Sequence, residues 1–219
     1  MNNLSQERLL VLWDHSLGLS PVYFGLDLIC ESFPEMNRER VMMLPLGKRD
    51  SLLIKIRQKI FGSDFSNTAN CPSCEEKVEW EMNINDFGLA ETSELLKNEI
   101  HQFSQGSYLL DYRLPSTGDM LELPGPKDDP SRWLLSRCII GARNKETPVD
   151  LTELPDEVLS SLSDRISRED ELADIRISLT CPACSKQWEA LFDIVQYLWS
   201  EVDAWAKQLM QDIAVLASN

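Results

Sequence analysis

The sequence contains no long hydrophobic run. Its uninterrupted apolar stretches are only a few residues long, far short of the ~20 that a helix needs to cross a bilayer. The N-terminal MNNLSQERLL also lacks the basic segment and apolar core of a secretory signal. We therefore predict a cytoplasmic protein without a membrane partner. With 219 residues, 43% hydrophobic and 26% charged, the composition is that of a folded protein with one large or two small domains.

Basic residues are scarce in the larger, C-terminal part of the chain. The formal net charge is −15, yet residues 1–70 carry eight charges of each sign. Residues 71–219 carry 13 basic and 28 acidic side chains. Affinity for nucleic acid backbones depends on Lys and Arg, so this distribution disfavours nucleic acid. It favours a protein partner, in particular one with a basic surface.

The usual signatures of catalysis are missing. The two histidines, His15 and His101, are isolated in the sequence. We find no phosphate-binding glycine loop and no nucleophile elbow. The many carboxylates of residues 146–174 are typical of a solvated acidic face. We therefore predict that the protein is not an enzyme and has no catalytic residues.

Helical periodicity dominates both ends of the chain. Apolar residues recur at helical spacing in three early segments, which predicts a small bundle from residues 5–17, 22–33 and 51–61. For the third helix we expect Asp50 or Ser51 as the N-cap and Gly62 as the end. A long amphipathic helix is predicted near the C-terminus, with an apolar stripe of Leu198, Val202, Trp205, Leu209, Ile213 and Leu216.

The middle of the chain mixes strand and helix patterns. Strict alternation of apolar and polar residues predicts strands at 78–84 and 175–179. Residues 107–115 and 119–124 flank Ser-Thr-Gly, which predicts a hairpin. Asp129 followed by Pro130 predicts the start of a helix, and residues 146–174 are expected to hold one or two short helices.

Four of the six cysteines form two matching motifs, CPSC at 71–74 and CPAC at 181–184. A strand-like segment with a tryptophan follows each motif, Trp80 after the first and Trp188 after the second. Two residues between cysteines allow a tight turn to aim both thiolates at one ion. Two such turns complete the four-sulfur tetrahedral site that structural zinc prefers. We predict one structural Zn²⁺ per chain, bound by Cys71, Cys74, Cys181 and Cys184.

The distance between the two motifs is unusual. A compact ribbon separates its cysteine pairs by about 15–20 residues, whereas 106 residues lie between Cys74 and Cys181. We interpret the intervening chain as an insertion between the two hairpins of one ribbon. The predicted fold is of the α+β class. Its domains are a helical bundle (1–66), a zinc ribbon (67–85 plus 175–193), an inserted acidic α/β subdomain (86–174) and a C-terminal amphipathic helix (194–219).

The two CPxC motifs have alternative interpretations. A CPxC motif also occurs at thiol–disulfide active sites, but these lie at helix N-termini, whereas both motifs here precede strand-like segments. Structural disulfides do not fit a chain without an export signal, and catalytic zinc needs an open ligand position. A dithiol redox protein and a zinc ribbon of the transcription class stay as alternatives. Cys30 and Cys138 lie in apolar helical stretches and are expected to be buried.

Several motifs together resemble a known family. They are LPLGKRD ahead of a helix, the two CPxC motifs, and a long helix that opens with Tyr-Leu-Trp. This combination is similar to the T4-family baseplate hub assembly chaperones of contractile phage tails and injection systems. The matching residues are Leu44, Pro45, Leu46, Gly47, Arg49, Asp50, Tyr197, Leu198 and Trp199. The resemblance implies assembly or scaffolding of a baseplate. The chain departs from the family where Glu75 and Ser185 replace the usual glycine after each knuckle.

Candidate partner contacts follow from these motifs. Trp199 and Trp205 lie in partly polar surroundings on the last helix, and Lys48 and Arg49 lie in the LPLGKRD motif. We predict contacts with tail, baseplate or hub proteins through these side chains. The C-terminal helix can also form an oligomer by pairing with a second copy of itself. The simpler alternatives are that both tryptophans pack on the helical bundle and that residues 47–50 only cap a helix.

Overall fold

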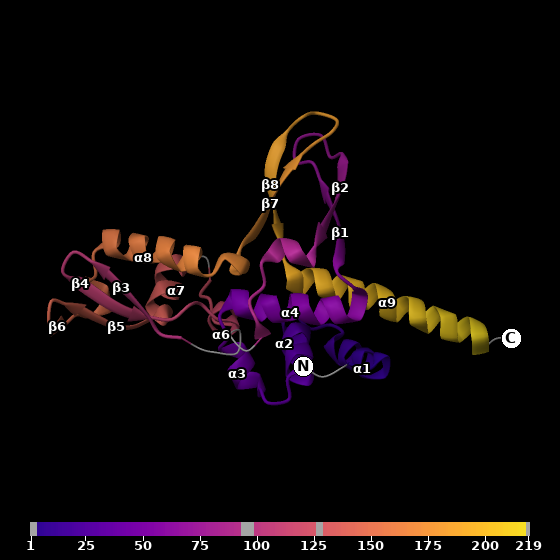
Figure 1. Ribbon diagram of the computed structural model, residues 1–219, viewed down its shortest axis with the longest axis horizontal. Coiled ribbons are helices and arrows are strands. Elements are labelled where there is room, and N and C mark those ends of the chain that lie inside the picture. The colour runs from indigo at the N-terminus through magenta and orange to yellow at the C-terminus, as the bar shows by residue number, and fades with distance from the viewer. Residues whose placement is uncertain (1–3, 93–98, 126–128, 218–219) are drawn as a thin grey trace. The chain divides into compact units, whose positions relative to one another are not determined.

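The computed structural model describes residues 4–92, 99–125 and 129–217, which group by contacts into two compact units (Figure 1). The ribbon unit consists of Met1–Val41, Asp50–Ala90 and Ile175–Asn219. The inserted unit consists of Met42–Arg49 and Glu91–Asp174. Both helices and strands are present, so the predicted α+β class is confirmed. Residues 42–49, which the domain prediction assigns to the bundle, group with the inserted unit. The division into four domains stays a prediction.

The predicted helices at both ends of the chain are present. Helices α1 (Gln6–Ser16) and α2 (Pro21–Ser32) are followed by the short α3 (Arg38–Met42), by α4 (Leu46–Phe61) and, after the ribbon, by the long α9 (Ile194–Ala217). The Ser5 side chain accepts a hydrogen bond from the Arg8 amide at 3.2 Å and so caps α1. Pro21 stands at the first position of α2, where its missing N–H costs nothing.

The core of the ribbon unit forms where α2, α4 and α9 meet. Its fully buried side chains are mostly aliphatic and include Leu26, Leu28, Ile29, Leu52, Leu53, Ile54, Leu198 and Val202. The charged side chain of Arg57 is also buried. It donates to both carboxylate oxygens of Glu201, at 2.9 and 2.6 Å, and to the Gly62 carbonyl at 2.7 Å. Because its donors are satisfied in this way, the guanidinium joins α4 to α9 without a large desolvation cost.

Helix α4 begins five to six residues earlier than predicted, because its cap comes from far along the chain. The Gly47 amide donates to both carboxylate oxygens of Asp170, at 3.1 and 3.2 Å, and the Leu46 amide donates to the Pro115 carbonyl at 3.0 Å. Asp50 and Ser51, the predicted caps, therefore lie inside the helix. Its predicted end is confirmed, since Gly62 adopts a left-handed φ of 93° just after Phe61.

Two antiparallel hairpins carry the cysteine motifs. Strand β1 (Asp64–Asn70) pairs with β2 (Lys77–Asn83), and β7 (Ile175–Thr180) pairs with β8 (Gln187–Phe192). Each hairpin is a two-stranded sheet of its own, and Figure 1 shows the two rising side by side. Strand β1 was not predicted, because its sequence DFSNTAN is largely polar and carries no β-branched alternation.

An aromatic cluster joins the bases of the two hairpins. Phe65 of β1 lies 5.3 Å from Phe87 of the short helix η1 (Ile84–Phe87) and 5.9 Å from Phe192 of β8, measured between ring centroids. Tyr197 of α9 lies 5.5 Å from Phe65, and its hydroxyl donates to the Ser66 carbonyl at 3.1 Å. Aromatic pairs at such separations stabilise beyond their buried area. The cluster therefore fixes both hairpins to the start of α9.

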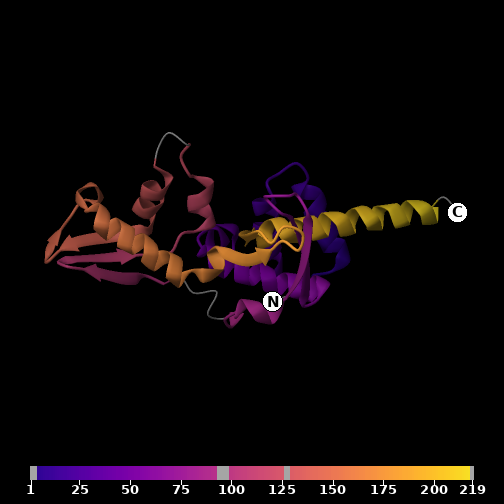
Figure 2. The same cartoon turned by 90° about the horizontal axis from the view of Figure 1, so that it is seen from above.

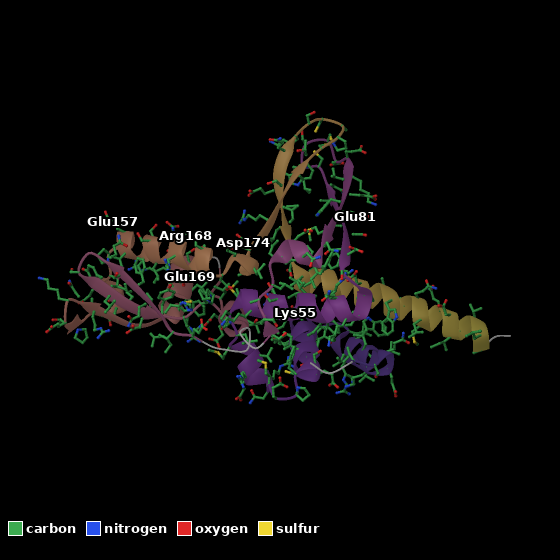
Figure 3. All side chains as sticks on the ribbon, viewed as in Figure 1. Lys55, Glu81, Glu157, Arg168, Glu169 and Asp174 are labelled. Atoms are coloured by element: carbon green, nitrogen blue, oxygen red, sulfur yellow. The ribbon has the colours of Figure 1, made fainter. Side chains whose placement is uncertain are left out.

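The inserted unit is a four-stranded antiparallel sheet covered by helices. The strand order is β3 (His101–Gln105), β4 (Tyr108–Tyr112), β5 (Ile139–Asn144) and β6 (Thr147–Pro148). The remaining elements are α6 (Thr117–Leu121), α7 (Pro130–Cys138), η2 (Leu151–Glu153), α8 (Asp156–Glu169) and η3 (Glu171–Ala173). The core side chains of α8, among them Leu162 and Ile166, pack with Leu110 and Tyr112 of β4. Figures 2 and 3 show α8 along the sheet, and Figure 3 shows Glu157 and Arg168, both exposed, on the outer side of this helix.

The predicted hairpin around residues 116–118 is wrong. Residues 117–121 form α6, and β4 pairs instead with β3 and β5. The reason is a capping box: the Ser116 hydroxyl accepts from the Asp119 amide at 3.4 Å, and the Asp119 carboxylate accepts from the Ser116 amide at 2.9 Å. The helix start at Asp129 and Pro130 is confirmed, but α7 ends at Cys138 because Ile139 begins β5.

The close contact between Gly47 and Asp170 yields a first prediction. A Cβ at position 47 would overlap the Asp170 carboxylate and lie 3.2 Å from the Ala173 amide nitrogen. Gly47→Ala should therefore displace the cap of α4 and lower the free energy of unfolding by about 1–3 kcal/mol, measured by urea denaturation. Gly125→Ala is the matched control, because its Cβ would meet nothing within 4 Å. Equal stability of the two variants would contradict this account.

A second prediction concerns the buried Asp119 carboxylate. Burial opposes its ionisation, but hydrogen bonds from Arg113, at 2.6 and 2.8 Å, and from Ser116 outweigh that effect and lower the pKa of Asp119 to about 2. Because the folded-state pKa is lowered, ionised Asp119 stabilises the fold above about pH 4, and this contribution disappears as the pH falls towards 2.

Asp119→Asn should therefore cost up to about 2 kcal/mol of unfolding free energy at pH 7 and much less at pH 2.5. Urea denaturation at the two pH values measures the difference. Asp156→Asn serves as the control, since that carboxylate is 91% exposed beside Arg132. A cost for Asp119→Asn that does not change with pH would refute the assignment.

Candidate metal centre

The first cysteine motif forms a tight turn between β1 and β2. The Glu75 amide donates to the Cys71 carbonyl at 2.9 Å, and the Cys71 amide donates to the Glu76 carbonyl at 2.8 Å. The Ser73 amide lies 3.5 Å from the Cys71 sulfur, to which it donates. The backbone of the turn thus positions Cys71 and offers a donor to its thiolate.

The second motif repeats this turn between β7 and β8. The Ser185 amide donates to the Cys181 carbonyl at 3.0 Å, and the Cys181 amide donates to the Lys186 carbonyl at 2.9 Å. Glu75 and Ser185 occupy equivalent places and have left-handed φ values of 62° and 60°. Both turns therefore form without the usual glycine, at a cost of about 1–2 kcal/mol for each non-glycine residue.

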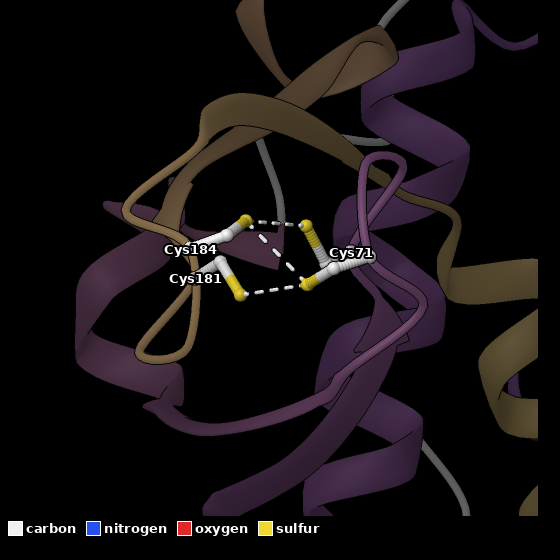
Figure 4. A group of neighbouring side chains, drawn as sticks. Cys71, Cys181 and Cys184 are labelled. Atoms are coloured by element: carbon white, nitrogen blue, oxygen red, sulfur yellow. Dashed lines mark hydrogen bonds between the residues drawn. The ribbon is translucent and has the colours of Figure 1, made fainter.

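The two turns bring the four sulfur atoms together (Figure 4). The Cys74 sulfur lies 3.4 Å from that of Cys184 and 3.6 Å from that of Cys181, and the Cys71 sulfur lies 3.6 Å from that of Cys184. All four lie within 4.8 Å of one another. A tetrahedral ion with bonds of about 2.3 Å requires sulfur–sulfur distances of about 3.8 Å, whereas a disulfide is about 2.05 Å long. The geometry therefore fits a bound ion.

The electrostatics of the cluster lead to the same conclusion. Burial disfavours the Cys71 thiolate, but amide donors from Ser73 and Cys74 and the neighbouring thiols lower the pKa of Cys71 to about 7. The Glu76 amide favours the Cys74 thiolate, yet Cys184 and Cys181 outweigh it and raise the pKa of Cys74 to about 12. The pKa of Cys71 is thus shifted towards the thiolate form and that of Cys74 away from it. A cation at the centre would favour the thiolate form of each cysteine that it binds.

The donor set defines the kind of site. It consists of sulfur alone, with Cys71 and Cys181 buried and Cys74 and Cys184 exposed. Within the described residues, no histidine or carboxylate adds a ligand to this group. Four sulfurs fill the tetrahedral positions and leave none open, which is the arrangement of a structural metal site. The four cysteines can therefore hold a metal ion.

The tryptophans predicted to contact a partner are half-buried within the ribbon unit. The Trp199 ring packs edge-to-face on Phe24, with centroids 5.2 Å apart. Trp205 lines a cavity of about 420 Å³ with Leu9, Ile56 and other side chains of the helical bundle. This geometry is that of the simpler alternative, in which both rings pack on the bundle. Only part of each ring is left for another protein.

The other predicted contacts, Lys48 and Arg49, belong to the inserted unit. Both side chains are half-buried in the first turn of α4. The Arg49 guanidinium donates to the Thr117 hydroxyl at 3.0 Å. These residues therefore contribute to the structure around the start of α4, and their role toward a partner stays a prediction.

Cys30, Cys138 and His101, which the sequence analysis also named, pack against other side chains of the fold. Cys138 is fully buried as predicted, whereas Cys30 is only half-buried. The His101 ring stacks on Tyr112 at 5.4 Å, and its Nδ1 lies 3.3 Å from the Glu169 carboxylate. The Tyr112 hydroxyl donates to the same carboxylate at 2.5 Å, and burial raises the pKa of this tyrosine to about 12. No local pattern in the sequence reveals this group, because its members are 11 to 68 positions apart.

The fold and the sulfur cluster define a four-cysteine ribbon protein with an insertion between its two hairpins. The family model described as T4 bacteriophage base plate protein matches residues 26–199, most of the chain, and the protein therefore belongs to that family. The match spans α4, both cysteine motifs and the start of α9, and it confirms the resemblance to baseplate proteins. Searches of the curated proteins and of the solved structures found no match. Among the helices that the structure describes, none has the length and hydropathy of a bilayer span.

A third prediction concerns removal of the ion. Cys71→Ser takes away one sulfur and should reduce the bound divalent metal from about one equivalent per chain to nearly none. Without the ion the tips of the two hairpins are no longer held together, so the near-UV circular dichroism of Trp80 and Trp188 should collapse. Elemental analysis and circular dichroism measure the two effects.

Cys30→Ser is the matched control, because it removes a thiol outside the cluster. It should retain both the metal and the native spectrum. A native spectrum for Cys71→Ser after complete loss of metal would show that the ion does not support the fold.

Proposed function

We propose that this protein is a non-catalytic assembly chaperone or structural adaptor for the baseplate or hub of a contractile tail or injection system. One structural Zn²⁺, bound by Cys71, Cys74, Cys181 and Cys184, holds its ribbon together. The observation that carries the proposal is the closed four-sulfur cluster in a chain of the T4 base plate family. In this proposal the protein works in the cytoplasm of the cell that produces the tail.

The geometry of the cluster supports a structural rather than a catalytic ion. Four thiolates leave no position for a water or a substrate, and catalysis by zinc requires such a position. Zinc also has no redox chemistry, and tetrahedral four-sulfur sites are typical of it. The ion therefore supports a rigid pair of hairpins that other proteins of the assembly can contact.

The alternative of a dithiol redox protein is less well supported. A redox CPxC pair reacts within one motif, at a helix N-terminus that lowers the thiol pKa. Here the short sulfur contacts join one motif to the other: both close neighbours of Cys74 lie in the second knuckle. Each motif also lies in a hairpin turn and not at a helix.

The alternative of a nucleic-acid-binding zinc ribbon lacks a basic surface. The exposed residues that flank the first knuckle are Glu75, Glu76, Lys77, Glu79 and Glu81, and the Lys77 ammonium pairs with Glu79 at 2.7 Å. Figure 3 shows Glu81 on the outer side of the first hairpin. A phosphate backbone is repelled by such a surface, whereas a basic protein is attracted to it.

The partners in this proposal are tail, baseplate or hub proteins. The proposed contacts are the parts of Trp199 and Trp205 that are not buried, together with Lys48 and Arg49. Trp199 and Arg49 belong to the motifs that resemble the family. Because Trp199 and Trp205 also support the bundle, their replacement by alanine would confuse loss of binding with loss of fold. A test through the metal ligands separates these effects better.

A fourth prediction tests the proposal in the cell that makes the tail. Native mass spectrometry of the protein purified gently from that cell should show one zinc per chain and an attached tail or baseplate polypeptide. A chromosomal Cys184→Ser variant should reduce the yield of assembled tails, while Cys30→Ser should not. A metal-free chain that carries disulfides and no tail polypeptide would overturn the proposal and favour the redox alternative.

A further inference from the structure

Helix α9 continues beyond the part of the ribbon unit that covers it. Leu198, Val202 and Ala206 are buried against the bundle. After Ala206 the described helix has no buried residue, and Figures 1 and 2 both show its last turns extending past α1 and α2. The exposed fractions of Ile213 and Leu216 are 49% and 77%. These are large apolar side chains in contact with water.

The exposed residues lie on the same helical face as the buried ones. Residues seven apart in an α-helix point in nearly the same direction. Val202, Leu209 and Leu216 form one such series, and Ala206 and Ile213 form another. The stripe that packs on the bundle in the first half of α9 therefore continues to the end of the described helix. Leu209 is half-buried, and Ile213 and Leu216 are exposed.

The end of α9 is also apolar away from this stripe. Seven of the nine residues in LMQDIAVLA, 209–217, are apolar. Met210 lies to one side of the stripe and is 50% exposed. A surface helix has an apolar stripe on one face only, whereas a helix that is apolar on most sides is buried in its functional state. Gln211 and Asp212 are the polar residues of this segment.

We infer that a partner protein encloses residues 209–217 of α9 in an apolar groove. This inference deepens the proposed function, on which it rests for the partner being a protein of the tail assembly. Recognition of an amphipathic or apolar helix by a groove uses side chains at positions i, i+4 and i+7, which here are Leu209, Ile213 and Leu216. The groove covers several sides of the helix at once and so removes Met210 from water as well.

A second copy of this chain fits the segment less well. Nine residues of helix are about 14 Å long, whereas a stable interface buries about 800 Å² on each partner with about 20–30 residues. Two such described segments, paired along one face, are too small for an interface of this size. A groove buries more area per residue because it contacts the helix on several sides.

The charge of Asp212 adds to this argument. Asp212 lies at the edge of the stripe, three residues after Leu209, and accepts a hydrogen bond from Gln208 at 2.8 Å. In a parallel pair of copies two Asp212 carboxylates would face each other, which is unfavourable. A groove with Lys or Arg on its rim would pair with this carboxylate instead. The expected partner surface is thus an apolar groove with a basic edge.

The test introduces a photo-reactive side chain into the full-length protein during tail assembly. Ile213→p-benzoylphenylalanine should cross-link to one polypeptide that mass spectrometry identifies as a tail or baseplate component. Gln211→p-benzoylphenylalanine is the control on the opposite side of the helix. Its cross-link to that polypeptide should be at least about tenfold weaker.

A pair of charge variants tests whether the apolar face itself binds. Ile213→Glu should reduce copurification of that polypeptide at least about tenfold, because it places a carboxylate in the groove. Gln211→Glu adds the same charge on the polar face and should change copurification little. Metal content and melting temperature should be unchanged in both variants, since both positions are exposed.

Three outcomes would overturn part or all of this account. Cross-links between two copies of the chain, or a dimer that Ile213→Glu dissociates, would identify a second copy as the occupant and refute the inference. If Cys184→Ser blocks tail assembly while Ile213→Glu changes neither assembly nor copurification, the inference fails and the proposed function stands. A cross-linked partner from outside the tail, with normal tail assembly in Cys184→Ser and Ile213→Glu, would refute the proposed function. Binding of the α9 end in a groove of that other partner would still stand.

Discussion

Four sulfur atoms connect two hairpins that the chain forms far apart in its sequence, and the ribbon unit depends on this connection. Closing a loop of about 100 residues costs about 5 kcal/mol of chain entropy. Apparent free energies of structural zinc binding are about 10–16 kcal/mol at neutral pH. An ion at this site therefore outweighs the cost of closure with a margin left for the two left-handed turns at Glu75 and Ser185. Without an ion, no sulfur–metal bonds offset this entropy at the tips of the hairpins.

Contacts at the bases of the two hairpins fix the start of α9 relative to the sulfur cluster. The cluster holds the tips of the hairpins, and the rings of Phe65, Phe192 and Tyr197 hold their bases. Tyr197 belongs to the first turn of α9, and Glu201, one turn later, pairs with the buried Arg57 of α4. The long helix is thus fixed at its start by aromatic packing and by an ion pair. This anchoring gives its exposed end a defined direction within the unit, which is what a segment that inserts into another protein requires.

The sequence was informative where structure follows from local pattern. Periodic apolar residues predicted α1, α2 and α9, and the spacing of Cys71, Cys74, Cys181 and Cys184 predicted the cluster. Prediction from local pattern failed where a residue distant in the sequence determines the start of an element or its pairing. Helix α4 starts at Leu46 because Asp170, 123 positions later, receives the Gly47 amide. Strand β1 is polar and exists because β2 pairs with it. Pairing partners and caps that are distant in the sequence leave no mark on a local window. The hairpin predicted around Ser116 failed for a different reason: the capping box between Ser116 and Asp119 is local, but the turn residues were given more weight.

The length of the insertion also determines the delay between the synthesis of the first and the second cysteine motif. The two knuckles are separated by 106 residues, and ribosomes add about 5–20 residues per second. The second knuckle therefore leaves the ribosome about 5–20 s after the first. During that interval Cys71 and Cys74 are available without their partners, and the sheet and helices between them have time to fold. Single domains of this size fold within about a second. The nascent chain thus carries half of the four-cysteine cluster past the insertion, and the cluster can form only after the second knuckle has been made.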